Sequence, residues 1–224
     1  MVRYVAELLN NMLLHSNNLP IRVLGLGPVA HEIRDYLRQQ SHPAECIDFQ
    51  QAFSDEHQKN YQYVIGSARV TQLRMQAQQW LADHDLNCPS LVHEQANVRD
   101  PSRLGRGVVC YPFSFVLEAD LGDHVFLAPY CHVGHNSRIG MGSVLLPYSF
   151  VLGSCRLSAW NVLQTKSNLL DFVAVSADYV NILPGAMVTK HIDYPGTYGG
   201  SPARRVNQDT TLTAEYFCRK TTAR

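Results

Sequence analysis

The sequence predicts a small Rossmann-like α/β region followed by a left-handed parallel β-helix of hexapeptide repeats with about five coils. An aliphatic residue recurs at every sixth position from Leu121 to Val175. The position four residues after each of these is small or β-branched in nine of ten cases. Before this repeat, short apolar runs alternate with amphipathic stretches, which is typical of a parallel α/β arrangement. These three observations decide the fold class.

The period of six fits neither an α-helix nor an ordinary strand, but it is typical of β-helices built from hexapeptides. Three hexapeptides make one coil, and neighbouring coils lie about 4.8 Å apart. We expect the large aliphatic residue to face the interior and the small residue to turn each corner. Such prisms are commonly left-handed, against the usual preference of parallel crossovers. The inward positions are Leu121, Leu127, Val133, Ile139, Leu145, Val151, Leu157, Leu163, Leu169 and Val175, continued upstream with slips by Val98, Leu104, Cys110 and Val116 and downstream by Ile182 and Val188.

The remaining elements follow from local patterns along the chain. Residues 1–19 carry a helical apolar stripe and are predicted as an N-terminal helix. Residues 20–90 are predicted as a small α/β domain, 91–194 as the β-helix, and 195–224 as a C-terminal cap and tail. Within the α/β domain we expect strands at Ile21–Leu26, Cys46–Phe49 and Tyr63–Gly66, and helices at Ala30–Leu37 and Thr71–His84.

Composition excludes several classes of function. The 224 residues contain 19 Lys plus Arg and 19 Asp plus Glu, with a pI near 7.1. This balance provides no basic surface for nucleic acid or for an anionic membrane. Small-molecule chemistry is therefore the expectation.

Cysteine usage and the first residues indicate a cytoplasmic protein. The six cysteines form no CxxC pair, and Cys131 and Cys155 fall on inward corner positions, so we expect reduced, buried thiols. Glu7, Asn10 and Asn11 interrupt the first apolar run, which argues against a signal peptide and against a membrane-spanning helix.

Three histidines, His124, His132 and His135, fall on outward phases of the repeat, and we expect them to lie close together at the surface. An exposed histidine is more often a solvated residue than a functional one. His135 differs because Gly153 follows one coil later on the same face. A glycine stacked over a histidine would leave an open strip for a ligand, although Gly153 also fits a simple turn.

A family resemblance is carried by VGHNSRIG, by VLGS one coil later, and by LPGAMVTKHI and GGSPARRV. These segments resemble the left-handed β-helix sugar acyltransferases of the sialic-acid O-acetyltransferase and UDP-4-amino-sugar N-acetyltransferase type. The segments IRVLGLGPVAHEIRDYL, YVIGSARVTQLRMQAQQWL and LVHEQANV are similar to that family's nucleotide-sugar-binding domain in order and spacing. The likeness covers roughly residues 20–206. The hexapeptide run is specific evidence for the fold, whereas the GLG turn alone is weak evidence for the resemblance.

The resemblance implies the reaction and its residues. His135 matches the general base that deprotonates the acceptor amine or hydroxyl during direct transfer from an acyl-CoA thioester. Gly153 matches a glycine beside the thioester, where its N–H could meet the developing oxyanion. Acetyl-CoA or another acyl-CoA is the implied co-substrate, and no metal is expected. Each basic candidate for binding the phosphates of the acyl-CoA also fits an ordinary solvated surface charge. The candidates are Lys166, Lys190, Arg204 and Arg205.

Two positions depart from the family pattern. Asn136 stands where the family has a carboxylate beside the histidine, and an amide stabilises imidazolium less well. More distant prism enzymes that acylate UDP-sugars also show His followed by Asn. Gly25 and Gly27 match the substrate-binding turn, but Pro28 removes a backbone donor there. Asp48 could hold a ribose or a base edge, or could cap the next segment.

The leading hypothesis is therefore an acyltransferase that acetylates an amino or hydroxyl group of a sugar or nucleotide sugar. A non-catalytic trimeric binding or scaffold protein of the same fold is the main alternative. A γ-class carbonic anhydrase, with three histidines on zinc, ranks lower because His132 and His135 lack that spacing. A homotrimer is expected from surface aromatic residues, which a second copy would cover. They are Phe113, Phe115, Tyr130, Tyr148 and Phe150.

Overall fold

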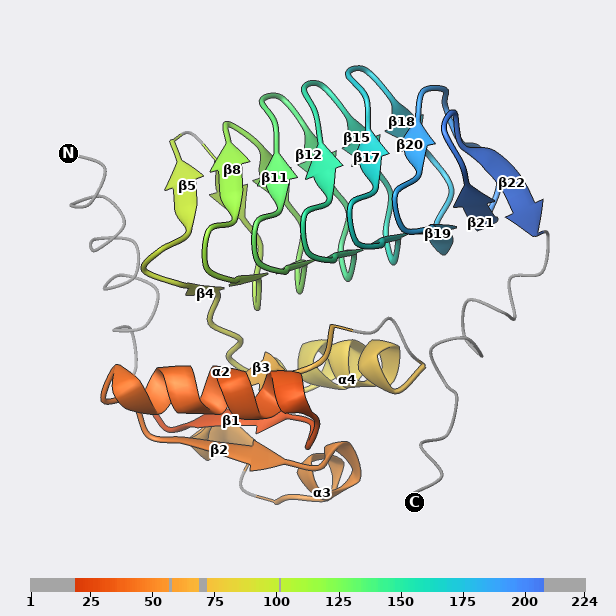
Figure 1. The fold of residues 1–224 in the computed structure, drawn as a ribbon. Coiled ribbons are helices and arrows are strands. Elements are labelled where there is room, and N and C mark those ends of the chain that lie inside the picture. Colours follow the sequence, from red (N-terminus) through yellow and green to blue (C-terminus); the bar gives the residue numbers. More distant parts are fainter. Residues whose placement is uncertain (1–18, 57, 69–71, 101, 208–224) are drawn as a thin grey trace, which may run out of the picture.

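The computed structural model describes residues 19–56, 58–68, 72–100 and 102–207. Within them the chain forms a small α/β region beside a long parallel β-helix (Figure 1). The helix predicted over residues 1–19 and the tail predicted beyond Asn207 fall outside the described residues, apart from their boundary residues. No helix in the described part of the chain has both the length and the apolar character needed to cross a bilayer.

The α/β region contains a three-stranded parallel sheet with strand order β2-β1-β3. All three predicted strands and both predicted helices are present. The second strand starts earlier than predicted. It also ends earlier, because Asp48 caps a short helix by accepting from Gln50 N at 2.9 Å. The elements are β1 (Ile21–Leu24), α2 (Pro28–Gln39), β2 (Ala44–Ile47), α3 (Phe49–Phe53), a 3-10 turn (Gln58–Asn60), β3 (Gln62–Ile65) and α4 (Gln72–Asp83).

Helix α2 joins the two parts of the molecule. Its buried residues Ala30, Ile33 and Leu37 belong to the same apolar cluster as the β-helix interior. From α4, Arg74 is 1% exposed and its Nη2 donates to the carbonyl oxygen of His124 at 2.6 Å. Burial lowers the pKa of Arg74 to about 10, so the guanidinium remains charged at neutral pH. A buried cation therefore ties the α/β region to a corner of the β-helix.

Three parallel sheets form the β-helix, and each coil contributes one strand to each sheet. Five coils are complete, and the hairpin β21–β22 follows the sixth, within the segment predicted as the cap. The eight-stranded sheet contains β4 (Leu91–Val92), β7 (Val109–Cys110), β10 (Phe126–Leu127), β13 (Val144–Leu145), β16 (Val162–Leu163), β19 (Val180–Ile182), β21 (Gly196–Gly199) and β22 (Arg204–Asn207). The six-stranded sheet contains β5 (Asn97–Arg99), β8 (Phe115–Leu117), β11 (His132–Val133), β14 (Phe150–Val151), β17 (Asn168–Leu169) and β20 (Met187–Val188). The five-stranded sheet contains β6 (Arg103–Leu104), β9 (Asp120–Leu121), β12 (Arg138–Ile139), β15 (Arg156–Leu157) and β18 (Ala174–Val175).

The interior confirms the predicted period. All ten aliphatic residues spaced by six from Leu121 to Val175 are at most 3% exposed. Each pairs with its counterpart one coil away, as Val133 does with Val151, so the large side chains form columns along the axis. The coils follow the predicted left-handed path (Figure 1).

The corners differ from the prediction in one respect. We expected the small residue to turn each corner, but the residue just before it has the left-handed backbone conformation. Asn136 has φ 56°, and the following Ser137 points inward, where its Oγ donates to the carbonyl oxygen of Leu152 at 2.8 Å. The small residues therefore link one coil to the next. Non-glycine residues with positive φ along the corners are Phe113, Glu118, His124, Tyr130, Asn136, Tyr148, Ser154, Trp160, Lys166, Phe172 and Tyr179.

Candidate active site

The corner between the six-stranded and five-stranded sheets carries the chemical groups, and we call it the His135 corner. Its turns follow β11, β14, β17 and β20. In these turns His135, Gly153, Asp171 and Lys190 occupy the same position in successive coils, each two residues after an inward residue of a paired strand. The four residues therefore form a column along the axis, in the order base, glycine, acid, base.

The ring of His135 lies directly on Gly153. A Cβ added to Gly153 would lie 2.7 Å from His135 Nε2 and 2.8 Å from Cε1, which is closer than real Cβ contacts. Only glycine accommodates the ring in this place. His135 is exposed, so part of its imidazole ring is open to solvent. The predicted pairing of His135 with Gly153 is present in the structure.

Asn136 contacts the other nitrogen of the imidazole. Its Nδ2 lies 3.2 Å from His135 Nδ1. The left-handed turn suits asparagine, which adopts positive φ more readily than most residues. Its backbone N–H donates to the carbonyl oxygen of Glu118 at 2.9 Å, one coil earlier. The amide is therefore placed to hold the ring through Nδ1.

The backbone N–H of Gly153 is already engaged. It donates to Asp171 Oδ1 at 2.9 Å. The expected oxyanion contact at this N–H would require Asp171 to move. Two turns of the corner between the five-stranded and eight-stranded sheets show the same arrangement, in which Asp123 accepts from Arg106 N and Asp178 accepts from Ala159 N, each at 2.9 Å. An acid that holds a backbone N–H of the preceding coil is thus a recurrent device of this β-helix.

The other two histidines do not join His135 at one surface site. His124 is 5% exposed, which contradicts the predicted outward position. It lies over Gly107, whose added Cβ would lie 2.4 Å from His124 Nδ1. Burial is the main reason that the pKa of His124 falls to about 4. His132 stacks on Phe115 with 5.2 Å between ring centroids, and burial lowers the pKa of this imidazole as well.

The described residues provide no metal site, and Cys131 and Cys155 are not placed as nucleophiles. Within the described ranges, no group of three His, Cys, Asp or Glu side chains is placed to hold a metal ion. Cys131 and Cys155 are buried, as predicted from their phase. Burial raises the pKa of the Cys131 thiol to about 11 and also raises that of Cys155. Both thiols are therefore poorly suited to nucleophilic attack.

The substrate-binding candidates of the α/β region gather at one edge of its sheet. Gly25 follows β1, Asp48 follows β2, and Leu24 pairs with Ile47 just before them. Gly25 has φ 123°, a conformation that favours glycine. Gly27 is the N-cap of α2, and no atom lies within 4 Å of a Cβ added there. Ligands of parallel α/β sheets commonly bind at this edge, although Asp48 is itself occupied in capping α3.

The four basic candidates are distributed over three places. Lys190 belongs to the column of the His135 corner. Lys166 lies on the neighbouring corner, between the eight-stranded and six-stranded sheets. Arg204 and Arg205 lie in β22, where Arg205 Nη2 donates to the carbonyl oxygen of Pro195 at 2.6 Å. Lys190 is therefore the candidate that shares a corner with His135.

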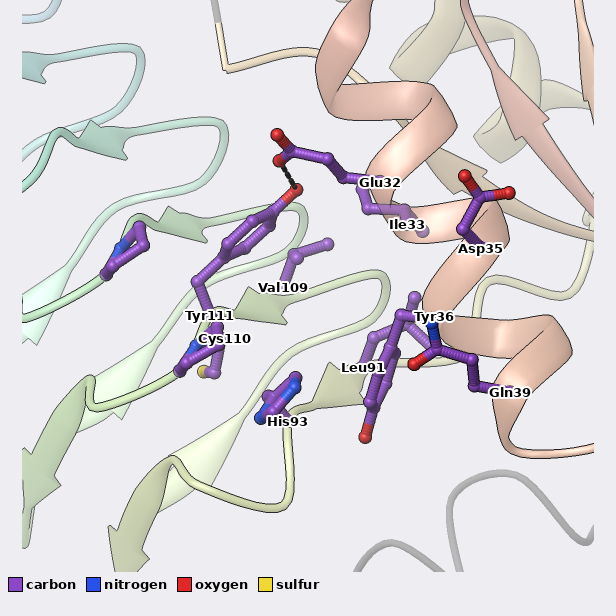
Figure 2. Close-up of a pocket in the computed structure, with 12 residues that line it drawn as sticks. Glu32, Ile33, Asp35, Tyr36, Gln39, Leu91, His93, Val109, Cys110 and Tyr111 are labelled. Carbon is purple, nitrogen blue, oxygen red and sulfur yellow. Dashed lines mark hydrogen bonds between the residues drawn. The ribbon is translucent and has the colours of Figure 1, made fainter.

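Two hollows on the described surface are lined mainly by residues that the sequence analysis did not single out. One, of about 400 Å³, separates α2 from the first coils. Figure 2 shows Tyr111 and Glu32 pointing toward one another across it, with Tyr111 Oη donating to Glu32 Oε2 at 3.2 Å. Tyr36 stacks on His93 with 4.5 Å between ring centroids. This hollow contains no residue of the His135 corner.

The second hollow, of about 570 Å³, adjoins the His135 corner. Asn136 and Ser137 form part of its wall, and the outer face of the five-stranded sheet supplies Arg103, Arg138 and Arg156. Sequence reasoning missed these arginines and Asp171. Their phase in the hexapeptide count was the signal available, because it places them on the outer face and on the corner next to His135.

Comparison with solved structures shows the same two-part fold. The chain is similar to PerB from Caulobacter crescentus in complex with CoA and GDP-perosamine, with TM-score 0.77 and 18% identity over 84% of this chain and 97% of that chain. It is similar to the acetyltransferase domain of PglB from Neisseria gonorrhoeae in complex with acetyl coenzyme A, with TM-score 0.77 and 17% identity over 85% and 100%.

A further similarity is to WeeI from Acinetobacter baumannii, with TM-score 0.62 and 16% identity over 84% of this chain and 100% of that chain. No family sequence model matches the chain, and no curated protein matches it in sequence. At these identities the likeness establishes the fold: a small α/β region followed by a left-handed β-helix of hexapeptide repeats.

Proposed function

We propose that this protein is an acyl-CoA-dependent acyltransferase that transfers an acyl group, acetyl in the simplest case, to an amino or hydroxyl group of a sugar or nucleotide sugar. The observation that carries this proposal is the exposed imidazole of His135 resting on Gly153. The fold neighbours support it, because PerB was solved with CoA and GDP-perosamine and the PglB domain with acetyl coenzyme A.

In the proposed reaction His135 acts as a general base. Its Nε2 takes the proton from the acceptor nitrogen or oxygen as that atom attacks the thioester carbonyl. The tetrahedral intermediate then collapses, the carbon–sulfur bond breaks, and the thiolate of CoA leaves after taking the proton from Nε2, which restores the base. Such assistance is worth about 10²–10⁴ in rate. Direct transfer requires no enzyme nucleophile, which agrees with the burial of Cys131 and Cys155.

If His135 acts as the base, the orientation of the Asn136 amide matters. For Nε2 to accept a proton, Nδ1 must carry one, and an acceptor beside Nδ1 favours this tautomer. The amide nitrogen of Asn136 now faces Nδ1 at 3.2 Å. Half a turn of this exposed amide would present Oδ1 instead and would select the reactive tautomer. Asn136 thereby has a positioning role in the proposal.

We place the acyl-CoA along the column of the His135 corner. The thioester would lie beside Gly153, and the rest of the molecule would run toward the C-terminal coils. Lys190 lies two coils beyond Gly153 on the same corner, which suits a contact to a CoA phosphate. Arg204 and Lys166 lie on other parts of the surface. They could contribute to the same ligand only at its far end or from a neighbouring copy.

The acceptor candidates lie in the α/β region. Gly25, Gly27 and Asp48 gather at the carboxyl edge of its sheet, where we propose that a nucleotide part of the acceptor binds. Pro28 at the first turn of α2 removes one phosphate-binding N–H. This edge therefore offers fewer donors to phosphates than a glycine-rich turn would.

A homotrimer is part of the proposal. Phe113, Tyr130 and Tyr148 form an exposed aromatic ladder on the corner beside the six-stranded sheet, with 4.9 Å between successive ring centroids. Phe150 is 39% exposed on the adjoining sheet. A second copy would cover this apolar surface. Sedimentation velocity should give three times the chain mass, and a monomer would contradict a site shared between copies.

The direct test is turnover. The protein should be incubated with acetyl-CoA and a panel of UDP- and GDP-linked amino sugars, with thiol release and product mass measured together. Acetylated product and stoichiometric free CoA are the expected result. Acetyl-CoA binding by calorimetry should accompany it.

A non-catalytic binding or scaffold protein is the second candidate. Two observations favour it: an amide in place of a carboxylate beside His135, and an Asp171 carboxylate that holds the N–H of Gly153. If neither acetyl-CoA binding nor product appears across the panel, this second function replaces the first.

A further inference from the structure

The outer face of the five-stranded sheet carries a column of charged residues beside the His135 corner. Strands β6, β9, β12 and β15 begin with Arg103, Asp120, Arg138 and Arg156, and the next residue of each strand faces the interior. The pairing register sets Arg103 opposite Asp120, Asp120 opposite Arg138, and Arg138 opposite Arg156. The corresponding positions of the six-stranded sheet include Phe115, His132 and Phe150.

Asp120, the carboxylate of this column, lies closer to Arg103 than to Arg138. Arg103 grips Asp120 with two hydrogen bonds, of 2.8 and 2.9 Å, and so holds the pKa of that carboxyl below its usual range. Arg138 Nε lies 3.5 Å from Asp120 Oδ2. Within the described residues, no carboxylate lies within salt-bridge distance of Arg156. Positive charge therefore accumulates toward the Arg156 end.

Arg138 and Arg156 are direct neighbours on paired strands, and we call them the Arg138–Arg156 pair. Strands pair at about 4.8 Å, and like charges directly opposite one another destabilise a sheet. Asp120 offsets part of this repulsion, because its Oδ2 lies 3.5 Å from Arg138 Nε. Two guanidinium groups carried by directly paired residues suit a phosphate or diphosphate, which accepts paired hydrogen bonds from arginine.

The same pair lines the hollow of about 570 Å³ whose wall includes Asn136 and Ser137. Asn136 directly follows His135, so an anion held here would lie next to the reacting corner. Glu118 also lines this hollow. It lies one coil before Asn136 and two coils before the strand that carries Arg156, so its negative charge is at the opposite end.

We propose that the Arg138–Arg156 pair binds a phosphate or diphosphate group of the acceptor. The identification of the ligand as the acceptor rests on the proposed acyl transfer. Binding of an anion by the pair does not depend on turnover. The pair also supplies the phosphate contacts that the turn at Gly27 and Pro28 lacks.

Inorganic pyrophosphate is the first probe. Its affinity should be measured by calorimetry at low ionic strength for the wild-type protein, Arg156→Gln, Arg138→Gln and the control Arg99→Gln. Arg99 is an exposed arginine at the end of β5 and lies outside this hollow. We expect both variants of the pair to weaken binding at least about tenfold, because a charged hydrogen bond is lost. The control should stay within about twofold. Equal affinity in all four proteins overturns the anion site.

A second set of titrations distinguishes the phosphates of the acceptor from those of CoA. UDP, GDP and CoA should each be titrated into the wild-type protein and the two variants of the pair. The proposal expects loss for UDP or GDP and an unchanged affinity for CoA. Loss confined to CoA overturns the assignment to the acceptor.

A contact between copies is tested by sedimentation velocity. Arg156→Gln should retain the oligomeric state of the wild-type protein, whereas dissociation would identify the pair as part of an interface and overturn the proposal. Pyrophosphate binding that is lost in both variants, together with absent acetyl transfer, would leave the anion site standing and remove only the proposed reaction.

Discussion

His124 and His135 are both corner residues of the β-helix, and each ring lies on a glycine one coil away. A Cβ at Gly107 would lie 2.4 Å from the His124 ring, and one at Gly153 would lie 2.7 Å from the His135 ring. Their surroundings differ. His124 is 5% exposed beneath Arg74, whereas His135 is open to solvent. In the described structure, Nδ1 of His124 has no hydrogen-bond partner, whereas Nδ1 of His135 faces Asn136.

The comparison shows that a histidine stacked on a glycine does not by itself indicate catalysis. Close stacking of coils brings corner side chains against the neighbouring turn wherever that turn carries a glycine. Reactivity depends on what else covers the ring. At His124, burial and the nearby Arg74 guanidinium disfavour the protonated form, with a pKa of about 4. At His135 the ring is exposed and a ligand can reach it.

Replacing each histidine should separate the two corners most strongly. His135→Ala should lower kcat by about 10²–10⁴, because the proposed base is lost. His124→Ala should leave kcat of the folded protein nearly unchanged. Acetyl transfer from acetyl-CoA, measured at saturating substrate after confirming folding by circular dichroism, decides between them. Full activity in His135→Ala would remove the proposed base.

Acid should destabilise the His124 corner. The pKa of His124 in the folded protein is about 4, below the ordinary 6.5, so the unfolded chain binds the proton more readily. Stability from the neutral ring is complete above pH 6.5 and is lost as the pH falls toward 4, by about 3 kcal/mol in total. Urea unfolding of the wild-type protein and of His124→Gln at pH 7 and pH 4 measures it. The same loss in both proteins would contradict the assignment to His124.

Adding a methyl group under each ring should also give different results. Gly153→Ala places a Cβ 2.7 Å from His135 Nε2, and a displaced base costs about 10² in kcat. Gly107→Ala is the matched control. Its Cβ meets the His124 ring and its φ is +61°, so it should lower the melting temperature while kcat of the folded protein persists. If Gly153→Ala keeps wild-type kcat, the placement of His135 on Gly153 does not serve the reaction.

The smallest effect concerns the neighbour of His135. Asn136→Asp should raise kcat by a few-fold, because a carboxylate stabilises the imidazolium formed in the reaction better than an amide does. Aspartate also tolerates the positive φ of 56° at this corner. Asn136→Ala, which removes the orienting group, should lower kcat instead. A carboxylate that lowers kcat as much as alanine would show that the amide itself is required.

The sequence determined the direction of side chains in the β-helix because strand geometry is local. A period of six placed Leu127 and Val133 inside and His135 outside, and it identified Gly153 as the residue stacked on that ring. The same count could have found Arg138, since its neighbour Ile139 was recognised as inward. The pattern of strands and helices in the α/β region was likewise readable, except where Asp48 ends the second strand early.

Only the tertiary structure decided what covers each outward side chain. His124 was predicted at the surface, but Arg74 from α4 closes over its corner. That contact joins residues 50 positions apart in the chain, and no local period encodes it. The hollow between α2 and Tyr111 likewise arises from packing between segments that are distant in the chain. Local geometry thus set which side chains point outward, and packing between distant segments set which of them a ligand can reach.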